Sequence, residues 1–359
     1  MNTTLDPSPK TRFYALDALR GIAALAVMFY HYTQHNGLNW LHGAWVAVDI
    51  FFILSGFVLM HSYGKKFLQG MTFRDFFISR IARLGPMYLV GLILGIVAAI
   101  MAYVSDTTES PPFYAIATTS TLNLFLLPYF NSQTWPFGDE SIYGTVFPLN
   151  DPSWSLFFEM FVNIVFFYCL TQFKSINLKL LALGAGAIFV ATTIYLHQVN
   201  PGATGKTFIY GFPRVTFEFF LGVIIYQFYN HYKLPPKFVI YSIFAVVALC
   251  FFSTLGAVAL ANSLIFAPIL IAVFAKVVVH TTGENICKFL GDISYPLYVT
   301  HFPIYRILFE SGFISNLDPV VETLLFSGIS IGTAVVLVKI DTSIRNSFKR
   351  KRLASLQNA

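Results

Sequence analysis

Apolar stretches long enough to cross a lipid bilayer recur along this sequence and constrain its fold more than any other feature. An α-helix rises about 1.5 Å per residue, so about 20 apolar residues cross a hydrocarbon core of about 30 Å. Ten such stretches follow one another, at residues 15–34, 43–63, 84–104, 154–173, 178–197, 207–229, 238–257, 261–280, 293–312 and 320–340. The pattern predicts an all-α polytopic membrane protein with about ten transmembrane helices, whose first partner is the lipid bilayer.

The composition agrees with a membrane location and excludes an ordinary soluble protein. Of the 359 residues, 56% are hydrophobic and only 11% are charged, against about 45–50% and about 25% in soluble domains. The formal net charge of +6 does not indicate a nucleic-acid-binding protein, because the basic residues lie in short connections rather than on one soluble face.

The distribution of basic residues predicts the orientation of the chain. With a cytoplasmic N-terminus, the cytoplasmic connections and tail contain Lys65, Lys66, Arg74, Arg80, Arg83, Lys174, Lys179, Lys233, Lys237, Lys288, Arg345, Lys349, Arg350, Lys351 and Arg352. The opposite connections contain almost only Lys206. The positive-inside rule therefore places both termini in the cytoplasm and favours an even number of spans. We expect a single transmembrane domain over residues 1–359, with cytoplasmic tails at 1–13 and 343–359.

The longest connection, residues 105–153, then lies outside the cytoplasm. It is rich in proline and acidic residues, and its apolar segment at 122–129 is too short to span the bilayer. Long loops in compact domains are usually functional, which favours a lid or an acceptor-binding element. A passive surface loop is the alternative.

The first predicted helix contains three residues that are unfavourable in lipid. Asp17, Arg20 and His31 interrupt an otherwise apolar run and should therefore face the protein interior or a wet cavity. Arg20 and His31 are eleven residues apart, which returns them to within about 20° of one helical face, about 16 Å apart along the axis. Asp17 lies one turn before Arg20, within pairing distance.

Arg80 and Arg83 are three residues apart and project from one face at the inner end of the third predicted helix. Two guanidiniums in this arrangement suit phosphate, because each offers paired donors and keeps its charge. The alternative is that they only enforce the positive-inside orientation.

The second and fourth predicted helices contribute further polar residues. Asp49 and Ser55 lie on the second helix, where Gly56 favours close helix packing, but Asp49 could equally be a solvated helix start. On the fourth helix Ser155 and Glu159 share a face, and a carboxylate this far into an apolar helix points to a function.

The sixth and ninth predicted helices each contain polar residues with two open interpretations. Arg214 and Glu218 are four residues apart and either neutralise each other structurally or serve the site. His301 follows Ser294 and Tyr295 in a helix that Pro303 should kink, and is either a second proton-handling group or, the interpretation we favour, a core histidine. No metal site is expected, because no His-Glu-x-x-His run or paired cysteine motif is present.

Together these motifs resemble those of the acyltransferase-3 family of membrane acyltransferases. The resemblance extends over nearly the whole chain, through Leu16-Asp17-Ala18-Leu19-Arg20-Gly21 with His31, Val48-Asp49 to Ser55-Gly56-Phe57, Arg80-x-x-Arg83-Leu84-x-Pro86, Trp154-Ser155-x-x-x-Glu159 and Ser294-Tyr295-x-x-Tyr298-x-x-His301. Ala18 departs from the family pattern, in which glycine is usual.

The resemblance implies an O-acyltransferase in a bacterial cytoplasmic (inner) membrane. Such enzymes take an acyl group, typically acetyl from cytoplasmic acetyl-CoA, and place it on a hydroxyl of an extracytoplasmic glycan or lipid-linked glycan. By resemblance, His31 and Arg20 are catalytic and Arg80 and Arg83 bind the acyl donor. From its position we add Glu159 to the catalytic residues. Supporting roles are expected for Asp17, Asp49, Ser55, Trp154, Ser155, Arg214, Glu218, Ser294, Tyr295 and His301.

The expected chemistry needs a base for the acceptor hydroxyl and positive charge for the donor. The ordinary pKa of histidine, about 6.5, allows His31 to be that base. We expect acyl-CoA as a co-substrate, no permanently bound cofactor, and a separate extracytoplasmic partner if the membrane domain does not handle the acceptor alone. The alternative class is a secondary transporter that uses buried charges for coupling, although no internal repeat supports it.

Overall fold

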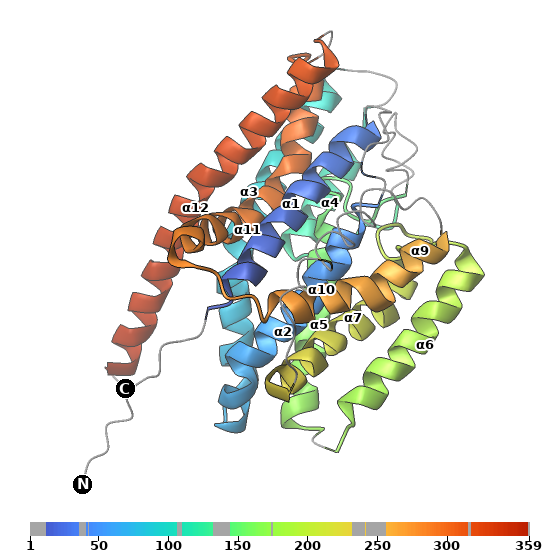
Figure 1. The fold of residues 1–359 in the computed structure, drawn as a ribbon. Helices are drawn as coiled ribbons and strands as arrows, with labels where there is room; N and C mark the ends of the chain where they lie inside the picture. Colours follow the sequence, from blue (N-terminus) through green and yellow to red (C-terminus); the bar gives the residue numbers. More distant parts are fainter. Residues whose placement is uncertain are drawn as a thin grey trace.

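Helices make up almost all of the structure (Figure 1). The computed structural model describes residues 12–35, 41, 43–105, 110–131, 144–173, 175–231, 241, 256–314 and 317–357. Within these ranges the only strand-like pairing is an isolated bridge between Thr145 and Thr204. The all-α prediction is therefore confirmed for the described part of the chain.

The helical elements follow the chain as α1 (Tyr14–His35), α2 (Val46–Leu68), α3 (Phe73–Val104), α4 (Phe113–Leu124), α5 (Ser153–Thr171), α6 (Leu178–Leu196), α7 (Phe208–Phe228), the short η2 (Tyr229–His231), α9 (Gly256–Ala261), the π-helical turn η3 (Asn262–Phe266), α10 (Ala267–Phe274), α11 (Thr281–Glu310) and α12 (Pro319–Gln357).

Within the described residues, six helical segments are long and apolar enough to cross a membrane: Val46–Leu68, Phe73–Val104, Ser153–Thr171, Leu178–Leu196, Phe208–His231 and Pro319–Ile344. This agrees with an integral membrane protein. The helices α1 and α11 are long enough to span a membrane but are less apolar than these six segments, as expected of helices that contain the polar motifs. The count of ten spans and the cytoplasmic location of both termini stay predictions.

Several helices extend beyond their predicted spans. The helix α3 begins at Phe73 rather than near residue 84, because the Thr72 side chain caps it by accepting a hydrogen bond from the Asp75 backbone. The helix α12 continues through the predicted tail to Gln357. The predicted span 238–257 lies almost wholly outside the described residues, and the tail 1–13 is described only from residue 12.

The predicted loop 105–153 contains a helix of its own. α4 packs against α3. After it, the Tyr129 backbone N–H donates to the Val146 carbonyl oxygen over 2.8 Å, and the Val146 N–H donates to the Ala203 carbonyl oxygen over 3.0 Å. These bonds connect the end of the loop to the segment before α7, so the approach to α5 is held by backbone contacts.

Two helix pairs form the frame of the molecule. The helix α1 packs along α11, and α2 packs along α7. At the second contact a Cβ on Gly56 would lie 1.9 Å from the Phe219 carbonyl oxygen, and one on Gly222 would lie 1.9 Å from the Ile53 carbonyl oxygen. Only glycine allows the two backbones to approach this closely, which confirms the packing role predicted for Gly56.

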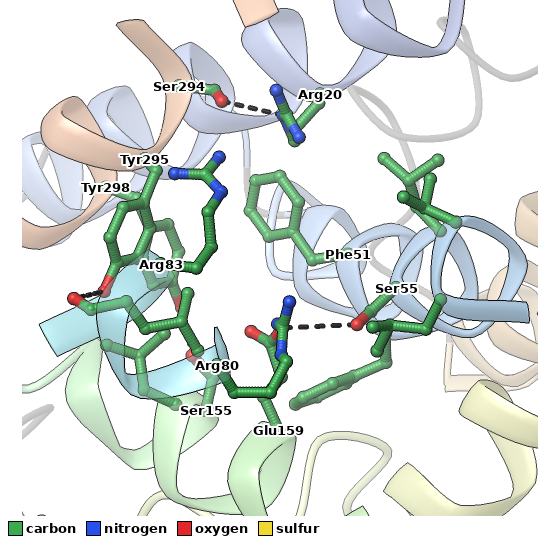
Figure 2. Close-up of a pocket in the computed structure, with 16 residues that line it drawn as sticks. Arg20, Phe51, Ser55, Arg80, Arg83, Ser155, Glu159, Ser294, Tyr295 and Tyr298 are labelled. Atoms are coloured by element: carbon green, nitrogen blue, oxygen red, sulfur yellow. Dashed lines mark hydrogen bonds and ion pairs between the residues drawn. The ribbon is translucent and has the colours of Figure 1, made fainter. Parts of the chain in front are cut away.

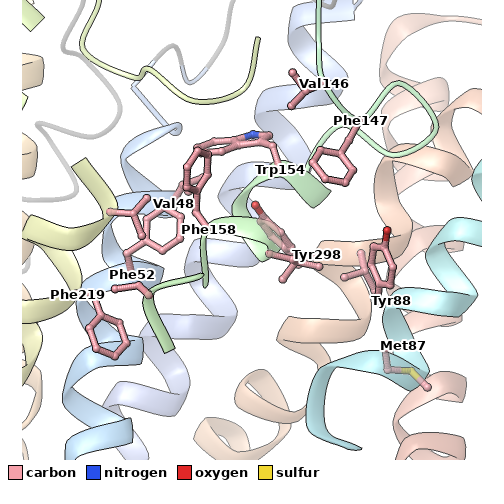
Figure 3. Packing of buried hydrophobic residues seen from close by; sticks show 14 of the residues in the cluster. Val48, Phe52, Met87, Tyr88, Val146, Phe147, Trp154, Phe158, Phe219 and Tyr298 are labelled. Atoms are coloured by element: carbon pink, nitrogen blue, oxygen red, sulfur yellow. The ribbon is translucent and has the colours of Figure 1, made fainter. Parts of the chain in front are cut away.

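An aromatic core fills the space between α2, α5 and α7 (Figure 3). Phe158, Phe166 and Phe219 are fully buried there, and Phe166 meets Phe219 edge to face with ring centroids 5.4 Å apart. Trp154 and Tyr298 belong to the same cluster. Their polar atoms therefore lie where the apolar core borders the cavities described next.

Candidate active site

One cavity among the described residues, which we name the arginine cavity, has a volume of about 160 Å³. Its side chains come from α1, α2, α3, α5 and α11 (Figure 2). The polar residues that line it are Arg20, Ser55, Arg80, Arg83, Ser155, Glu159, Ser294, Tyr295 and Tyr298. Three guanidiniums and one carboxylate therefore face this space, and the cavity favours an anionic ligand.

Glu159 connects three helices at one side of the arginine cavity. Its Oε1 accepts a hydrogen bond of 2.8 Å from Arg80 Nη2 and one of 3.2 Å from Ser55 Oγ. Among the described residues, the buried Nε of Arg80 has no hydrogen-bond partner. Glu159 thus holds Arg80 in place while part of its donor capacity stays unused.

Arg83 and Arg20 are held by other partners. Arg83 Nη1 lies 3.8 Å from Asp341 Oδ2 of α12, and its guanidinium lies over the Tyr295 ring, 5.6 Å from the centroid. Arg20 donates from Nε to Ser294 Oγ over 2.9 Å and from Nη2 to the Gly291 carbonyl oxygen over 2.8 Å. The motif around Ser294 therefore anchors Arg20, from α11.

Asp17 forms the predicted pair with Arg20, with Oδ1 3.2 Å from Arg20 Nη2. Its Oδ2 accepts a second bond of 2.7 Å from Arg12 Nε. Partial burial opposes the charged Arg12 guanidinium, but the hydrogen bond and charge of Asp17, with the charge of Asp292, outweigh it and raise the pKa of Arg12. Asp17 does not line either cavity, so its contacts are those of a positioning residue.

The second cavity, which we name the histidine cavity, has a volume of about 150 Å³. It is lined by Val27, Tyr30, His31, Trp45, Val48, Asp151, Pro152, Trp154, Gln198, Asn200, Ala203, Thr204, Arg214 and Tyr298. Aromatic walls with a few polar groups are typical of a small-molecule site. His31 is here and Arg20 is not, so the structure separates the two residues that the first motif joins.

His31 and His301 form a hydrogen-bonded pair. His301 Nε2 lies 3.1 Å from His31 Nδ1, and His301 Nδ1 lies 2.9 Å from the Leu297 carbonyl oxygen. His31 Nδ1 also lies 3.0 Å from the Val27 carbonyl oxygen. His301 is fully buried and bonds to His31 of α1, as a core histidine bonded to a neighbouring helix would, and the same contact places it beside the candidate base, so its role in handling protons stays a prediction.

Tyr298 is the residue that lines both cavities besides belonging to the aromatic core. Its hydroxyl lies 2.7 Å from Ser155 Oγ, and Ser155 Oγ donates to the Pro152 carbonyl oxygen over 2.9 Å. Tyr298 and Ser155 therefore lie at the boundary between the arginine cavity and the histidine cavity.

Asp49 belongs to a buried ionic network. Arg214 donates to Asp49 from Nη2 and lies 3.3 Å from Glu218 Oε1 through Nε, and Ser263 Oγ donates to the second Asp49 oxygen. Asp49, Arg214 and Glu218 each have an exposed fraction of 0%. The interpretation of Asp49 as a solvated helix start is wrong, and the Arg214–Glu218 pair is part of a larger network.

Trp154 connects this network to the histidine cavity. Its ring lies under the Arg214 guanidinium, 5.6 Å from centroid to Cζ, and Trp154 and Arg214 both line the cavity.

Among the described residues, no group of three histidine, cysteine or acidic side chains has a geometry that could hold a metal ion.

Sequence reasoning missed one residue of the histidine cavity and undervalued another. Asp151 Oδ2 lies 3.6 Å from His31 Nε2, yet Asp151 counted only as one acidic residue of a long loop. Its signal was its position three residues before Trp154, at the start of the Trp154-Ser155 motif. Tyr298 appeared only as a motif member, although its spacing of three residues from His301 places both on one helical face.

A known family matches most of the chain. A family model described as an acyltransferase domain, that of the acyltransferase-3 family, matches residues 13–339. Nearly all of the residues discussed above lie inside this range. No solved structure matches the chain at a significant level.

Similar proteins come from several bacteria. A Rhizobium radiobacter protein named "Protein 2 in picA locus" is 37% identical over 164 residues, which are 45% of this chain and 84% of the relative. The "Putative peptidoglycan O-acetyltransferase YrhL" of Bacillus subtilis is 24% identical over 80% of this chain, and the "Putative O-acetyltransferase SACOL0978" of Staphylococcus aureus is 25% identical over 85%.

This chain spans about half of the two named O-acetyltransferases, 48% of the first and 52% of the second. The activities of those longer proteins therefore do not transfer directly to this chain. The family match covers most of the present chain and includes both cavities. The chain belongs to the acyltransferase-3 family of membrane O-acyltransferases.

Proposed function

We propose that this protein transfers an acetyl group from cytoplasmic acetyl-CoA to a hydroxyl of an extracytoplasmic glycan, with His31 as the general base. The observation that carries the proposal is the pair of cavities that share Tyr298 as a wall, one lined by arginines and the other by His31. A donor in the first cavity and an acceptor in the second would meet at that wall.

The hydrogen bonds around His31 support its role as base. A carbonyl oxygen only accepts, so the contact with Leu297 puts the hydrogen of neutral His301 on Nδ1 and leaves Nε2 as an acceptor. His31 Nδ1 then donates to His301 Nε2, and to the Val27 carbonyl oxygen. The lone pair of neutral His31 is consequently on Nε2, the nitrogen that faces Asp151.

The arginine cavity supports the role of donor site. Arg80 and Arg83 offer charged donors that suit phosphate oxygens, and Arg20 adds a third guanidinium to the same lining. We assign Arg20 to donor binding rather than to the chemical step, because it lines the arginine cavity and not the histidine cavity.

In the proposed step, the acceptor oxygen attacks the thioester carbonyl carbon while its proton passes to His31 Nε2. The tetrahedral intermediate then collapses, the carbon–sulfur bond breaks, and CoA leaves as the thiolate and takes the proton from His31, which returns to its neutral form. We propose direct transfer, because no nucleophile for an acyl-enzyme stands out. No permanently bound cofactor takes part.

The finer assignments follow the family and the names of the relatives. Acetyl as the acyl group and a cell-envelope glycan as acceptor are proposed because two relatives are named as O-acetyltransferases, one of them for peptidoglycan. A bacterial inner membrane and a separate extracytoplasmic partner complete the proposal.

The test uses the purified full chain in lipid nanodiscs with labelled acetyl-CoA and candidate envelope glycans. We expect label in the glycan from the unchanged protein, and a loss of at least about 100-fold in His31→Ala, the contribution typical of a general base. His231→Ala is the matched control, since His231 is exposed and lines neither cavity. Transfer retained in His31→Ala would refute the base assignment. In sealed proteoliposomes, which unlike nanodiscs enclose a compartment, coupled solute uptake without transfer would favour a transporter.

A further inference from the structure

The histidine cavity presents two hydrogen-bond acceptors to one space. The first is Nε2 of neutral His31, whose lone pair follows from the bonds that fix His301 and His31 Nδ1. The second is Oδ2 of Asp151. The two atoms are 3.6 Å apart, beyond hydrogen-bond length, so neither satisfies the other while His31 is neutral.

The position of Asp151 is fixed by its surroundings. Thr145 Oγ1 donates to the other carboxylate oxygen, Oδ1. Thr145 is itself held by the bridge to Thr204 and by the adjoining bond from Val146 N–H to the Ala203 carbonyl oxygen. The Asp151 carbonyl oxygen accepts from the Trp154 N–H at the start of α5 over 3.2 Å. The carboxylate therefore keeps Oδ2 toward His31 without help from a ligand.

A single hydroxyl group cannot serve both acceptors. It has one hydrogen, which His31 must accept if the hydroxyl is to be activated. A second donor on the same ligand is needed for Asp151, because its side chain is only 16% exposed and its carboxylate loses its remaining water when a ligand fills the cavity, which is unfavourable unless the ligand supplies a donor. Adjacent hydroxyls on neighbouring carbons supply two donors at the short spacing that the two acceptors require.

We propose that Asp151 is the specificity-determining residue of the acceptor site and selects alcohols that carry a second hydrogen-bond donor beside the reacting hydroxyl, that is, vicinal diols. The proposal rests on the proposed function, because it takes the histidine cavity as the acceptor site. The apolar faces of Trp45 and Trp154 in the same cavity suit the carbon skeleton of such a ligand.

The geometry predicts an inversion of preference in Asp151→Asn. The Thr145 hydroxyl should keep the side-chain oxygen as its acceptor, which turns the amide nitrogen of the variant toward the cavity. That nitrogen is a donor, so a neighbouring ether oxygen becomes favourable and a neighbouring hydroxyl loses its advantage. Asp151→Ala should abolish the preference in either direction.

The experiment compares a vicinal cyclohexanediol with its monomethyl ether as acceptors for acetyl-CoA, using the full chain in nanodiscs. We expect kcat/KM to favour the diol by about 10-fold or more in the unchanged protein, as when a ligand lacks one needed donor. Asp151→Asn should reverse the ratio. Because the ratio compares two acceptors on one enzyme, a general loss of rate in a variant cancels.

Asp318→Asn is the matched control, since Asp318 is exposed, caps α12 through the Val320 N–H, and lines neither cavity. Its diol preference should be unchanged. Binding of the same two probes is measured separately, without any turnover, by the fluorescence of the four tryptophans of the chain, of which Trp45 and Trp154 line the cavity.

The two hypotheses fail differently in this design. Equal binding of diol and ether to the unchanged protein, or a preference that Asp151→Asn does not alter, overturns the role of Asp151 whatever the activity. Diol-selective binding that depends on Asp151 but is accompanied by no acyl transfer keeps the acceptor-recognition proposal and overturns the proposed reaction.

Discussion

The three arginines of the arginine cavity differ in how tightly a carboxylate holds them. The nearest nitrogen–oxygen distance is 2.8 Å for Arg80 with Glu159, 3.2 Å for Arg20 with Asp17 and 3.8 Å for Arg83 with Asp341. Only the first two are hydrogen bonds. Arg83 therefore gives up least when an incoming phosphate replaces its partner.

We predict that Arg83→Ala raises the KM for acetyl-CoA by about 10-fold or more, the effect of losing one charge-assisted hydrogen bond. The KM for the acceptor should stay unchanged, because Arg83 does not line the histidine cavity. Initial rates with each substrate varied in turn separate the two constants.

The control for this prediction is Arg74→Ala, which removes an exposed guanidinium from the first turn of the same helix. Both constants should be unaffected in that variant. An unchanged KM for acetyl-CoA in Arg83→Ala would show that Arg83 only helps to fix the orientation of the chain in the membrane.

For individual residues, the sequence identified most polar side chains of the site but not their partners. Burial in lipid is unfavourable enough to mark Arg20, His31 and Glu159 from the sequence alone. The environment of Asp49 could not be predicted, because it depends on Arg214 and Ser263, 165 and 214 residues away. Asp151 was missed because it lies in a loop, where acidic residues are common and usually face solvent.

Among the helices, the contact between α2 and α7 is the closest described above. Gly56 and Gly222 each lie against a backbone carbonyl of the other helix. A carbonyl oxygen cannot rotate away as a side chain would, so an added methyl group forces the helices apart. This contact also positions Asp49 of α2 beside Arg214 of α7.

We predict that Gly56→Ala lowers the free energy of unfolding by about 1–3 kcal/mol, the usual effect of overpacking. Thermal unfolding in nanodiscs measures the change. Gly184→Ala in α6 is the matched control, because a Cβ there would meet nothing within 4 Å, and it should be neutral or slightly stabilising. Equal stability of both variants would show that α2 and α7 separate without penalty.

Helix existence was predictable from hydropathy, whereas helix ends were not. The apolar windows at 178–197 and 207–229 nearly coincide with α6 and α7. The helices α3 and α11 begin about three turns before their predicted spans. Their first turns are polar, so a window that selects apolar residues does not include them.

In the whole molecule, the two cavities are separated by the side chain of Tyr298, which contacts Ser155. We predict that Tyr298→Ala joins the cavities and lets water reach the donor. The variant should hydrolyse acetyl-CoA to acetate and CoA without an acceptor, at a rate at least several-fold above the unchanged protein. Release of free thiol, with the acceptor omitted, measures this hydrolysis.

Tyr298→Phe is the informative control, because it keeps the ring and removes only the hydroxyl that contacts Ser155. Hydrolysis should stay near the level of the unchanged protein in this variant. If Tyr298→Ala releases no more thiol than Tyr298→Phe does, the ring is not what keeps water from the donor.

The buried network of Asp49, Arg214 and Glu218 also has a consequence for biosynthesis. Asp49 precedes Arg214 by 165 residues, which at about 5–20 residues per second is a delay of roughly 10–30 s on the ribosome. During that time α2 holds a carboxylate whose positive partner has not been made. The newly made N-terminal helices must therefore shelter Asp49 from lipid until α7 arrives and the assembly of the bundle can be completed.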